Sequence, residues 1–539
     1  MRSSSLFALL ALLTACGGPM AYAPAPTALL PSATLAQAAA PRHTSTPTPS
    51  PVPTATPHPT PTLAPTPTPA APIDAPFDLA AQAAALRPEQ AADMDMAAAW
   101  NRYTISGTLD VEARQLRAEQ RVDYTNRDSA PLDAIYFHLY PNLGDFGGST
   151  EVASLSVDGQ AVEPVLEAKG FLLRVNLPQP LAPGASASVR LGFTTTAPLG
   201  ASRSKYGAFN KEAGVLAMAS AYPTLALVRG GAWDTERPDP KGDFVNSETA
   251  LYDVSLRAPA DWKLVTTGAA VGYEVREGVQ ASRFVSGPQR DFTLAALQLQ
   301  EASTHVDGTT ITSYFRPGSA EQGQQALDAA ARALAIYNRR FGPYPQRELE
   351  IIEISATIFF GVEYPGLTMI NHTLYSSNTG ELEITVAHEV AHMWFYNAVG
   401  NNVLRESWLD EAMASYAQVI YREETAGPAA AERELASFRE RYRSNRAAGR
   451  DAPVGQGNSA FGKNYFAVVY GKGTLFIQAL RNELGEEAFD RFLHSYYQQR
   501  RYQYVGGGDL LASAEDACGC QLDTLYTNWI ERAVAVKVP

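Results

Sequence analysis

Two histidines lie four residues apart in residues 385–395, which read TVAHEVAHMWF. On a helix, His388 and His392 share one face, so both imidazoles reach a single ion. Zinc prefers such ligands, and a catalytic zinc keeps three protein ligands and a water. Glu389 stands beside the first histidine, where it serves as general base for a zinc-activated water in the mechanism attached to this motif. A short pattern also arises by chance, so the alternative is an amphipathic helix that merely carries two histidines.

A third ligand is offered by Glu411, in the segment SWLDEAMASYAQ. The apolar spacing predicts a helix over residues 406–422, after a first helix over 381–395. If these helices run antiparallel, Glu411 returns to the imidazoles and completes a His₂Glu set for one zinc ion. A lone glutamate ordinarily lies on a solvated helix face, but its spacing from HEVAH favours the ligand. Asp410 and Asn397 are nearby candidates to hold the free imidazole N–H groups.

The surrounding elements indicate a multidomain chain, β followed by α/β. Residues 98–301 are short alternating runs separated by turn residues, which predicts an antiparallel β-saddle or sandwich domain. Residues 302–539 mix strands and helices and become nearly all helical beyond residue 427, which predicts an α+β catalytic domain with a helical C-terminal subdomain. The chain has 539 residues, more than one core accommodates.

The segments HEVAHMWFYNAV and WLDEAMASY resemble the zinc aminopeptidase N family, gluzincin metallopeptidases that include the leukotriene hydrolases. Segments of the β region, among them IYFHLYPN, AYPTLAL and KGDFVNSE, are similar to the family's N-terminal saddle domain, particularly in short bacterial members. The resemblance covers residues 98–535. It implies a thermolysin-like catalytic domain, one catalytic zinc ion and peptide substrates.

The resemblance also implies a binding site for the substrate's α-amine. In the family, a strand written G-A-M-E-N carries a glutamate that binds this amine, and FGVEYPG places Glu363 there. Phe360, Gly361, Val362 and Tyr364 replace the family's other residues. The glutamate is therefore kept in an altered setting.

Two tyrosines follow from the same resemblance. A family tyrosine ahead of Lys-Gly stabilises the tetrahedral oxyanion, and NYFAVVYGKGTLF places Tyr470 in that context. Tyr465 matches a second tyrosine near the site of some relatives and is a substrate-binding candidate.

Many members also offer Gln or Glu from the β domain to the amine, just ahead of the segment around Tyr222; here the nearest polar side chain is Ser220. This departure, and the lack of a large C-terminal helical domain, predict a more open cleft with weaker selection of N-termini.

The amino-terminal residues predict export. Residues 1–16 have a short positive start, an apolar stretch and the sequence LTAC ending at Cys16, which resembles the lipobox of bacterial lipoproteins. Residues 17–75 include a Pro/Thr-rich tract typical of an extended, disordered linker. We expect a membrane anchor through lipidated Cys16 on the extracytoplasmic face of a bacterial membrane. An ordinary secretory signal cleaved nearby is the alternative. No later stretch is apolar and long enough to span a bilayer.

The net charge and the cysteines indicate which kinds of partner and metal site the chain can have. The net charge is −13 with no basic stripe, which argues against a nucleic-acid partner. Cys518 and Cys520 stand in DACGCQ, where one intervening residue is expected to strain a disulfide. Two thiols alone also make a poor zinc site, so these cysteines are expected to be structural or incidental.

Three functions fit these observations. The first is a zinc aminopeptidase that hydrolyses N-terminal residues from peptides. The second is a zinc endopeptidase of thermolysin type, in which Glu363 only positions the peptide backbone. The third is a non-catalytic, surface-anchored binding protein on a peptidase fold, although no ligand or base of the motif is broken.

Overall fold

The computed structural model describes residues 73–204, 208–239, 241–377, 380–534, 536 and 538. The predicted signal peptide, Cys16 and nearly all of the predicted linker lie outside these residues. Among the helices that the structure does describe, none combines the length and hydrophobicity needed to cross a membrane. The lipid anchor and the domain boundaries remain predictions.

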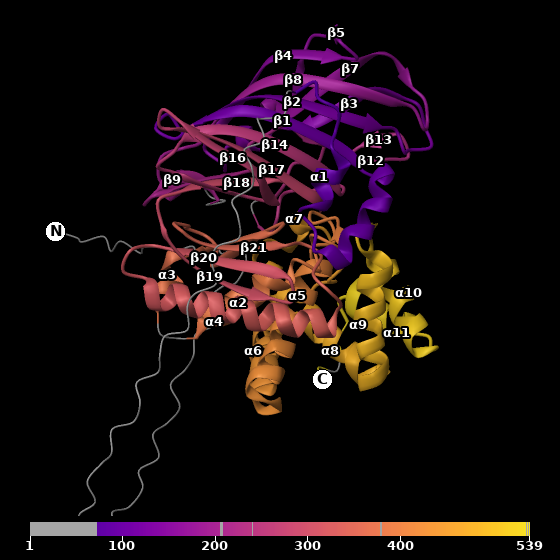
Figure 1. Cartoon of the computed structure of the whole chain (residues 1–539). Coiled ribbons are helices and arrows are strands. Elements are labelled where there is room, and N and C mark those ends of the chain that lie inside the picture. Colours follow the sequence, from indigo (N-terminus) through magenta and orange to yellow (C-terminus); the bar gives the residue numbers. More distant parts are fainter. Residues whose placement is uncertain are drawn as a thin grey trace, which may run out of the picture.

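A β-rich region occupies one side of the molecule, and the helices gather on the other (Figure 1). The largest sheet has the order β16-β17-β14-β1-β2-β8-β4-β5. Along β2 every second side chain is buried, because successive side chains of a strand point to opposite faces. The strands of this sheet are β1 (Asn101–Asp110), β2 (Gln115–Thr125), β4 (Ser149–Val157), β5 (Gln160–Ala161), β8 (Ser186–Thr196), β14 (Ala250–Pro259), β16 (Ala269–Arg276) and β17 (Val279–Gln289).

Smaller sheets complete the β region. Two have four strands, in the orders β15-β18-β10-β9 and β11-β3-β7-β6, and one is the hairpin β12-β13. The strands are β3 (Leu132–His138), β6 (Val165–Glu167), β7 (Leu172–Leu181), β9 (Phe209–Glu212), β10 (Val215–Ala219), β11 (Thr224–Leu225), β12 (Val228–Arg229), β13 (Ala232–Trp233), β15 (Lys263–Thr266) and β18 (Thr293–Leu297).

A five-stranded sheet lies between the β region and the helices. Its order is β19-β20-β21-β23-β22, with β19 (Gln300–Val306), β20 (Thr309–Phe315), β21 (Glu348–Ile354), β22 (Gly361–Tyr364) and β23 (Leu367–Asn371). On β21, Leu349 and Ile351 pack into the helical core, whereas Ile352 and Ile354 pack with β10, β15 and β18. Because both faces are covered, β21 is buried along nearly its whole length, its glutamates Glu350 and Glu353 included.

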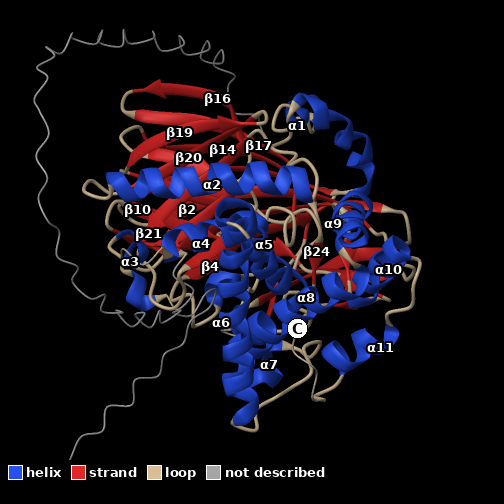
Figure 2. Cartoon of the chain, turned by 90° about the horizontal axis from the view of Figure 1, so that it is seen from below, coloured by secondary structure: helices blue, strands red, loops and turns tan. Residues whose placement is uncertain are grey.

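Helices cover the other face of this sheet, as the view from below shows (Figure 2). The α-helices are α1 (Leu79–Ala83), α2 (Ala320–Arg340), α3 (His372–Tyr375), α4 (Glu381–Ala391), α5 (Trp408–Ala426), α6 (Pro428–Ala447), α7 (Asn458–Phe461), α8 (Gly473–Leu484), α9 (Glu486–Arg500), α10 (Gly507–Cys518) and α11 (Asp523–Tyr526). The 3₁₀ turns are η1 (Pro88–Ala99), η2 (Tyr140–Asn142), η3 (Ala168–Gly170), η4 (Ala201–Arg203) and η5 (Gly462–Asn464), and the π-helices are η6 (Phe466–Lys472) and η7 (Thr527–Glu531). The short strands β24 (Gly400–Asn401) and β25 (Tyr504–Val505) pair in parallel. The predicted multidomain fold, β followed by α+β with a helical end, is confirmed.

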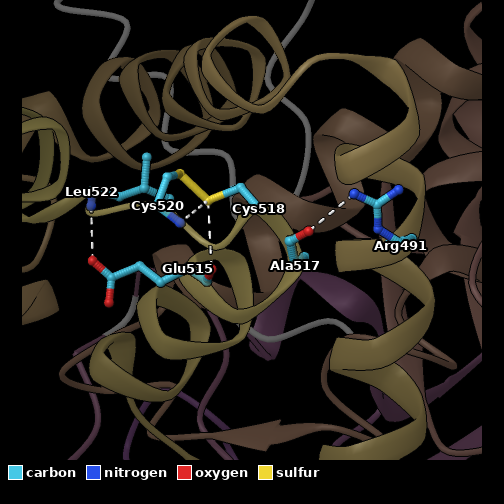
Figure 3. Close-up of a disulfide and its surroundings, with 6 residues drawn as sticks. All are labelled: Arg491, Glu515, Ala517, Cys518, Cys520 and Leu522. Carbon is cyan, nitrogen blue, oxygen red and sulfur yellow. Dashed lines mark hydrogen bonds between the residues drawn. A yellow bond between two sulfur atoms is a disulfide. The ribbon is translucent and has the colours of Figure 1, made fainter.

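Cys518 and Cys520 form a disulfide at the end of α10 (Figure 3). The sequence had led us to expect a strained bridge at best, and the structure shows that the bridge forms. Gly519 has φ 63° and turns the chain, so the two cysteine Cα atoms lie 5.2 Å apart, within the usual range for disulfides. The backbone N–H of Leu522 donates to Glu515 at 2.7 Å, which holds the turn that follows.

Candidate metal centre and active site

Three side chains converge between α4 and α5. His388 lies in the last turn of α4, His392 is the C-terminal cap of that helix, and Glu411 lies in the first turn of α5. The two imidazole Nε2 atoms are 3.2 Å apart, and Oε2 of Glu411 lies 3.3 Å and 3.5 Å from them. Ligand atoms about 3.3 Å apart are expected at the corners of a tetrahedron around zinc, whose bonds are about 2.0–2.1 Å long. The three buried side chains therefore fit one zinc ion.

The protonation states suit a cation at this point. Burial alone would raise the pKa of Glu411, but the hydrogen bonds and charges of the two imidazoles lower it to about 2. The carboxylate is therefore ionised at neutral pH. It places a buried negative charge where the zinc ion is expected.

Each imidazole is oriented through its other nitrogen. Nδ1 of His388 donates to Oε1 of Gln418 at 3.1 Å, and the amide of Gln418 in turn donates to Glu434 at 2.6 Å. Nδ1 of His392 donates to the carbonyl of Phe395 at 3.0 Å. Because both Nδ1 atoms face oxygen acceptors, they carry the protons, and both Nε2 lone pairs are left for a metal.

Asp410 and Asn397 do not hold the imidazoles, so that expectation was wrong. Oδ1 of Asp410 accepts from the backbone N–H of Glu411 at 2.8 Å, and Oδ1 of Asn397 accepts from the backbone N–H of Arg290 at 3.4 Å. Both side chains are used by the neighbouring backbone. The actual acceptors lie two helical turns further along α5 and in the turn after α4, on positions that no sequence motif marks.

Glu389 lies between the two histidines and faces β22. A Cβ on Gly361 would lie 2.3 Å from Oε1 of Glu389, so only glycine lets the strand approach so closely. Oε2 of Glu389 is buried and has no hydrogen-bond partner among the residues that the structure describes. Burial raises the pKa of Glu389 to about 8, against the lowering effect of His388. An open, buried carboxyl oxygen beside the metal ligands is suited to take up and release a proton.

Glu363 lies on β22 beside Glu389, and a carboxyl group from the β region joins it. Polar atoms of Glu363, Glu389 and His392 all lie within 4.8 Å of one another. The carboxyl of Asp243 lies close enough to that of Glu363 for each group to affect the other. Burial raises the pKa of both groups, that of Asp243 to about 7, and Asp243 raises that of Glu363 further. So many buried carboxyl groups favour a cation next to the metal site.

Asp243 is a site residue that the sequence did not reveal. The segment just ahead of Tyr222 supplies no Gln or Glu, as the sequence indicated, with Ser220 as its nearest polar residue; the carboxyl group comes instead from the loop after β13. The loop that follows β13 reaches the site because Gly242, at φ 81°, packs on the phenol of Tyr465; a Cβ there would lie 2.1 Å from Oη. An acidic residue in a Gly-Asp turn is common, so no pattern distinguished this one.

The two tyrosines occupy different places. Tyr470 lies in the π-helix η6, and its phenol donates to Oε1 of Glu411. Single π-turns occur frequently at functional sites. Tyr465 is 1% exposed and packs on Gly242 and on the ring of Tyr470, with ring centroids 6.0 Å apart. A direct substrate contact by Tyr465 remains a prediction, and its packing suggests that it positions the Asp243 loop.

A buried network fixes the other end of this loop. Nε2 of His138 lies 3.0 Å from the carbonyl of Asp234, and Nδ1 lies 3.2 Å from the phenol of Tyr140. Asn246 donates its backbone N–H to that phenol at 3.3 Å and its amide to the Asp234 carboxylate at 2.5 Å. The network therefore holds the chain just after Asp243.

The network predicts a pH-dependent loss of stability. Burial lowers the pKa of His138 to about 4 from its ordinary value of 6.5. Above pH 6.5 the side chain is neutral in both states; as pH falls from 6.5 to 4, only the unfolded state gains a proton. We expect about 3 kcal/mol of unfolding free energy to be lost over this window, since one pKa unit is about 1.4 kcal/mol. Urea unfolding of wild type and His138→Gln at pH 7 and pH 4.5 measures it, and equal pH dependence in both proteins would contradict it.

A buried His₂Glu set, with its glutamate on the helix after HExxH, defines the gluzincin class of metallopeptidases. Residues 325–529 match the model of the peptidase family M1 domain. This stretch holds the zinc-ligand set, Glu363, Glu389 and both tyrosines. Over this stretch the chain is similar to peptidase family M1, which agrees with the resemblance to the aminopeptidase N family.

Relatives of known name share part of the chain. Human aminopeptidase RNPEPL1 is 32% identical over 300 residues, and rice aminopeptidase M1-B is 26% identical over 311 residues. Each match covers 52% of this chain but only 41% and 34% of the relative. The M1 zinc metallopeptidase of Deinococcus radiodurans shares the fold with a TM-score of 0.62 at 21% identity, over 81% of this chain and 95% of that one. A variant of that protein has been solved with the substrate Tyr-Ser-Ala.

Proposed function

We propose that the chain is a zinc-dependent aminopeptidase that removes N-terminal residues from peptides. The observation that carries this proposal is the pair of carboxyl groups, Glu363 from the catalytic domain and Asp243 from the β region, beside the His₂Glu site. A free α-amine is a cation at neutral pH, and a buried carboxyl pair binds a cation favourably. The names of the matched relatives support the same activity.

In this proposal each remaining group has a task. His388, His392 and Glu411 would hold the zinc ion, which would supply Lewis-acid chemistry to the scissile carbonyl and to a water. Glu389 takes the proton of the attacking water and delivers it to the leaving amine. Tyr470, whose phenol donates to Glu411 in the absence of substrate, lies where it can donate to the developing oxyanion.

The other two functions are less well supported. An endopeptidase must continue the peptide past the position where an amine would lie, and there it would bury two carboxyl groups against uncharged backbone. A non-catalytic binding protein would not need the open oxygen of Glu389 or the ordered imidazoles. The matched relatives favour neither alternative.

Free and N-acetylated forms of one peptide test the activity. We expect hydrolysis of the free form only, release of its first residue, loss of activity with a chelator and recovery with one equivalent of zinc. Equal rates on the two forms would replace the aminopeptidase by the endopeptidase. Full activity in a metal-free preparation would reject both.

Asp243→Asn tests the contribution of the β region. Loss of a charge-assisted hydrogen bond to the amine is expected to raise KM roughly 10- to 100-fold, with a smaller change in kcat. Asp261→Asn removes a carboxylate from the exposed surface of the same region and serves as the control for net charge. Steady-state kinetics on an amino-acid arylamide measures both variants. An unchanged KM in Asp243→Asn would remove this residue from the amine site.

We further propose, from the sequence alone, that Cys16 is lipidated and that the enzyme works outside the cytoplasmic membrane. In that case the wild-type protein partitions with membranes, and Cys16→Ser is released in soluble, exported form. Equal partitioning of the two would contradict the anchor.

A further inference from the structure

Helix α6 carries an arginine next to the site that the proposed mechanism does not use. Arg441 follows Phe438 by three residues and Glu434 by seven, so the three share a face of the helix. Glu434 holds the Gln418 amide that orients His388, so this face looks toward the metal ligands. Long helical side chains lean toward the N-terminus, and the guanidinium carbon of Arg441 accordingly lies 6.0 Å from the centre of the Phe438 ring.

Arg441 also borders the oxyanion tyrosine. Its Cδ lies 3.8 Å from where a Cβ would stand on Gly471, the residue after Tyr470. The guanidinium is close enough to interact electrostatically with the Tyr470 phenol and the Glu434 carboxyl. It is therefore a positive charge on the Tyr470 side of the site.

The guanidinium is half-buried, and among the residues that the structure describes it forms no hydrogen bond or ion pair. Nearby arginines differ: Arg439 pairs with Glu432 at 2.6 Å and Arg422 with Glu383 at 3.4 Å. A partly buried charge without a close partner is costly, and the planar fork of an arginine fits a carboxylate with two parallel hydrogen bonds. Among the described residues Glu434 acts on Arg441 only through its charge, so the guanidinium fork remains open to a carboxylate that would form hydrogen bonds with it.

The site carries charges of both signs, as the two ends of a short peptide do. Asp243 and Glu363 offer negative charge for an α-amine, and Arg441 offers positive charge beside Tyr470. An extended chain spans about 3.3–3.6 Å per residue, so the carboxylate of a dipeptide or tripeptide lies about 7–10 Å from its amine. Resting on the aminopeptidase function proposed above, we propose that Arg441 binds the C-terminal carboxylate of the substrate and that the enzyme prefers dipeptides and tripeptides with a free C-terminus.

A comparison of Ala-Ala with Ala-Ala-amide tests this. Wild type is expected to show roughly 10- to 100-fold higher kcat/KM on the free acid, the range for a hydrogen-bonded charge. Arg441→Gln is expected to bring the acid-to-amide ratio near one. Arg441→Lys keeps the positive charge but not the planar fork of the guanidinium. Its acid-to-amide ratio is expected to lie between those of the wild type and Arg441→Gln. Arg443→Gln, an exposed position two residues away, is expected to keep the wild-type ratio.

The outcomes separate this inference from the function on which it rests. If wild type fails to hydrolyse Ala-p-nitroanilide, which has no carboxylate, the aminopeptidase function itself is wrong. If it hydrolyses the anilide but has the same kcat/KM for Ala-Ala and Ala-Ala-amide, Arg441 does not bind the C-terminal carboxylate. If the enzyme prefers Ala-Glu-amide over Ala-Gln-amide but does not prefer Ala-Ala over Ala-Ala-amide, the carboxylate that it binds belongs to a side chain of the substrate. That result would also overturn the inference. The wild-type comparison stands even if Arg441→Gln does not fold.

Discussion

Replacing Glu389 by glutamine lowers kcat for peptide hydrolysis by about 10²- to 10⁴-fold, the usual contribution of a general base. Glutamine has the same shape, but its amide cannot accept the proton of the attacking water. The zinc ligands are other residues, so the variant is expected to keep its metal. Steady-state kinetics on an amino-acid arylamide, with metal analysis of the same preparation, measures both quantities.

Glu381→Gln is the matched control, because Glu381 lies in the first turn of the same helix, away from the histidines. It is expected to retain wild-type kcat and zinc content. A Glu389→Gln variant within a few-fold of wild type would show that another group takes the proton. Loss of zinc together with activity would show that Glu389 acts mainly by shaping the metal site.

Tyr470→Phe is expected to lower kcat by about 10²- to 10³-fold, as removal of one oxyanion donor does. The phenol reaches Glu411 in the absence of substrate, so it already lies within hydrogen-bonding distance of the metal site. Phenylalanine keeps the ring packing of η6 and removes only the donor. KM is expected to change little, because the donor acts on charge that develops in the transition state.

Tyr465→Phe provides the comparison from the same π-helical region. Its phenol packs on Gly242, at the base of the Asp243 loop. We therefore expect a rise in KM of a few-fold with kcat retained, the signature of a loosened amine site. If Tyr465→Phe loses as much kcat as Tyr470→Phe, the oxyanion role belongs to both tyrosines.

These predictions share one structural feature, an active site assembled from two regions. The five-stranded sheet packs against helices on one face and against the β region on the other, so it fixes the Asp243 loop relative to Glu363. Gly361 and Gly242 then allow close backbone approach, to Glu389 and Tyr465 respectively. We therefore expect small displacements between the two regions to change KM more than they change kcat.

Residues whose geometry follows from local spacing could be identified from the sequence. His388 and His392 had to share a face because four residues make about one helical turn. The alternation of the β region likewise predicted which side chains are buried, since side-chain direction in a strand is set by the period of two. Glu411, Glu363 and Tyr470 needed the family resemblance in addition, because their distance from HEVAH along the chain does not determine a contact.

Other features were decided only by the tertiary structure. Asp243 meets Glu363 across the boundary between two regions, and Gln418 and the Phe395 carbonyl, rather than Asp410 and Asn397, hold the imidazoles. The disulfide between Cys518 and Cys520 depends on the left-handed turn at Gly519. Hydrogen-bond partners depend on where packing brings distant segments to within about 3 Å, which a local pattern does not encode. The sequence by itself thus determined the metal-binding helix and the fold class, whereas packing between regions decided which charges surround the substrate.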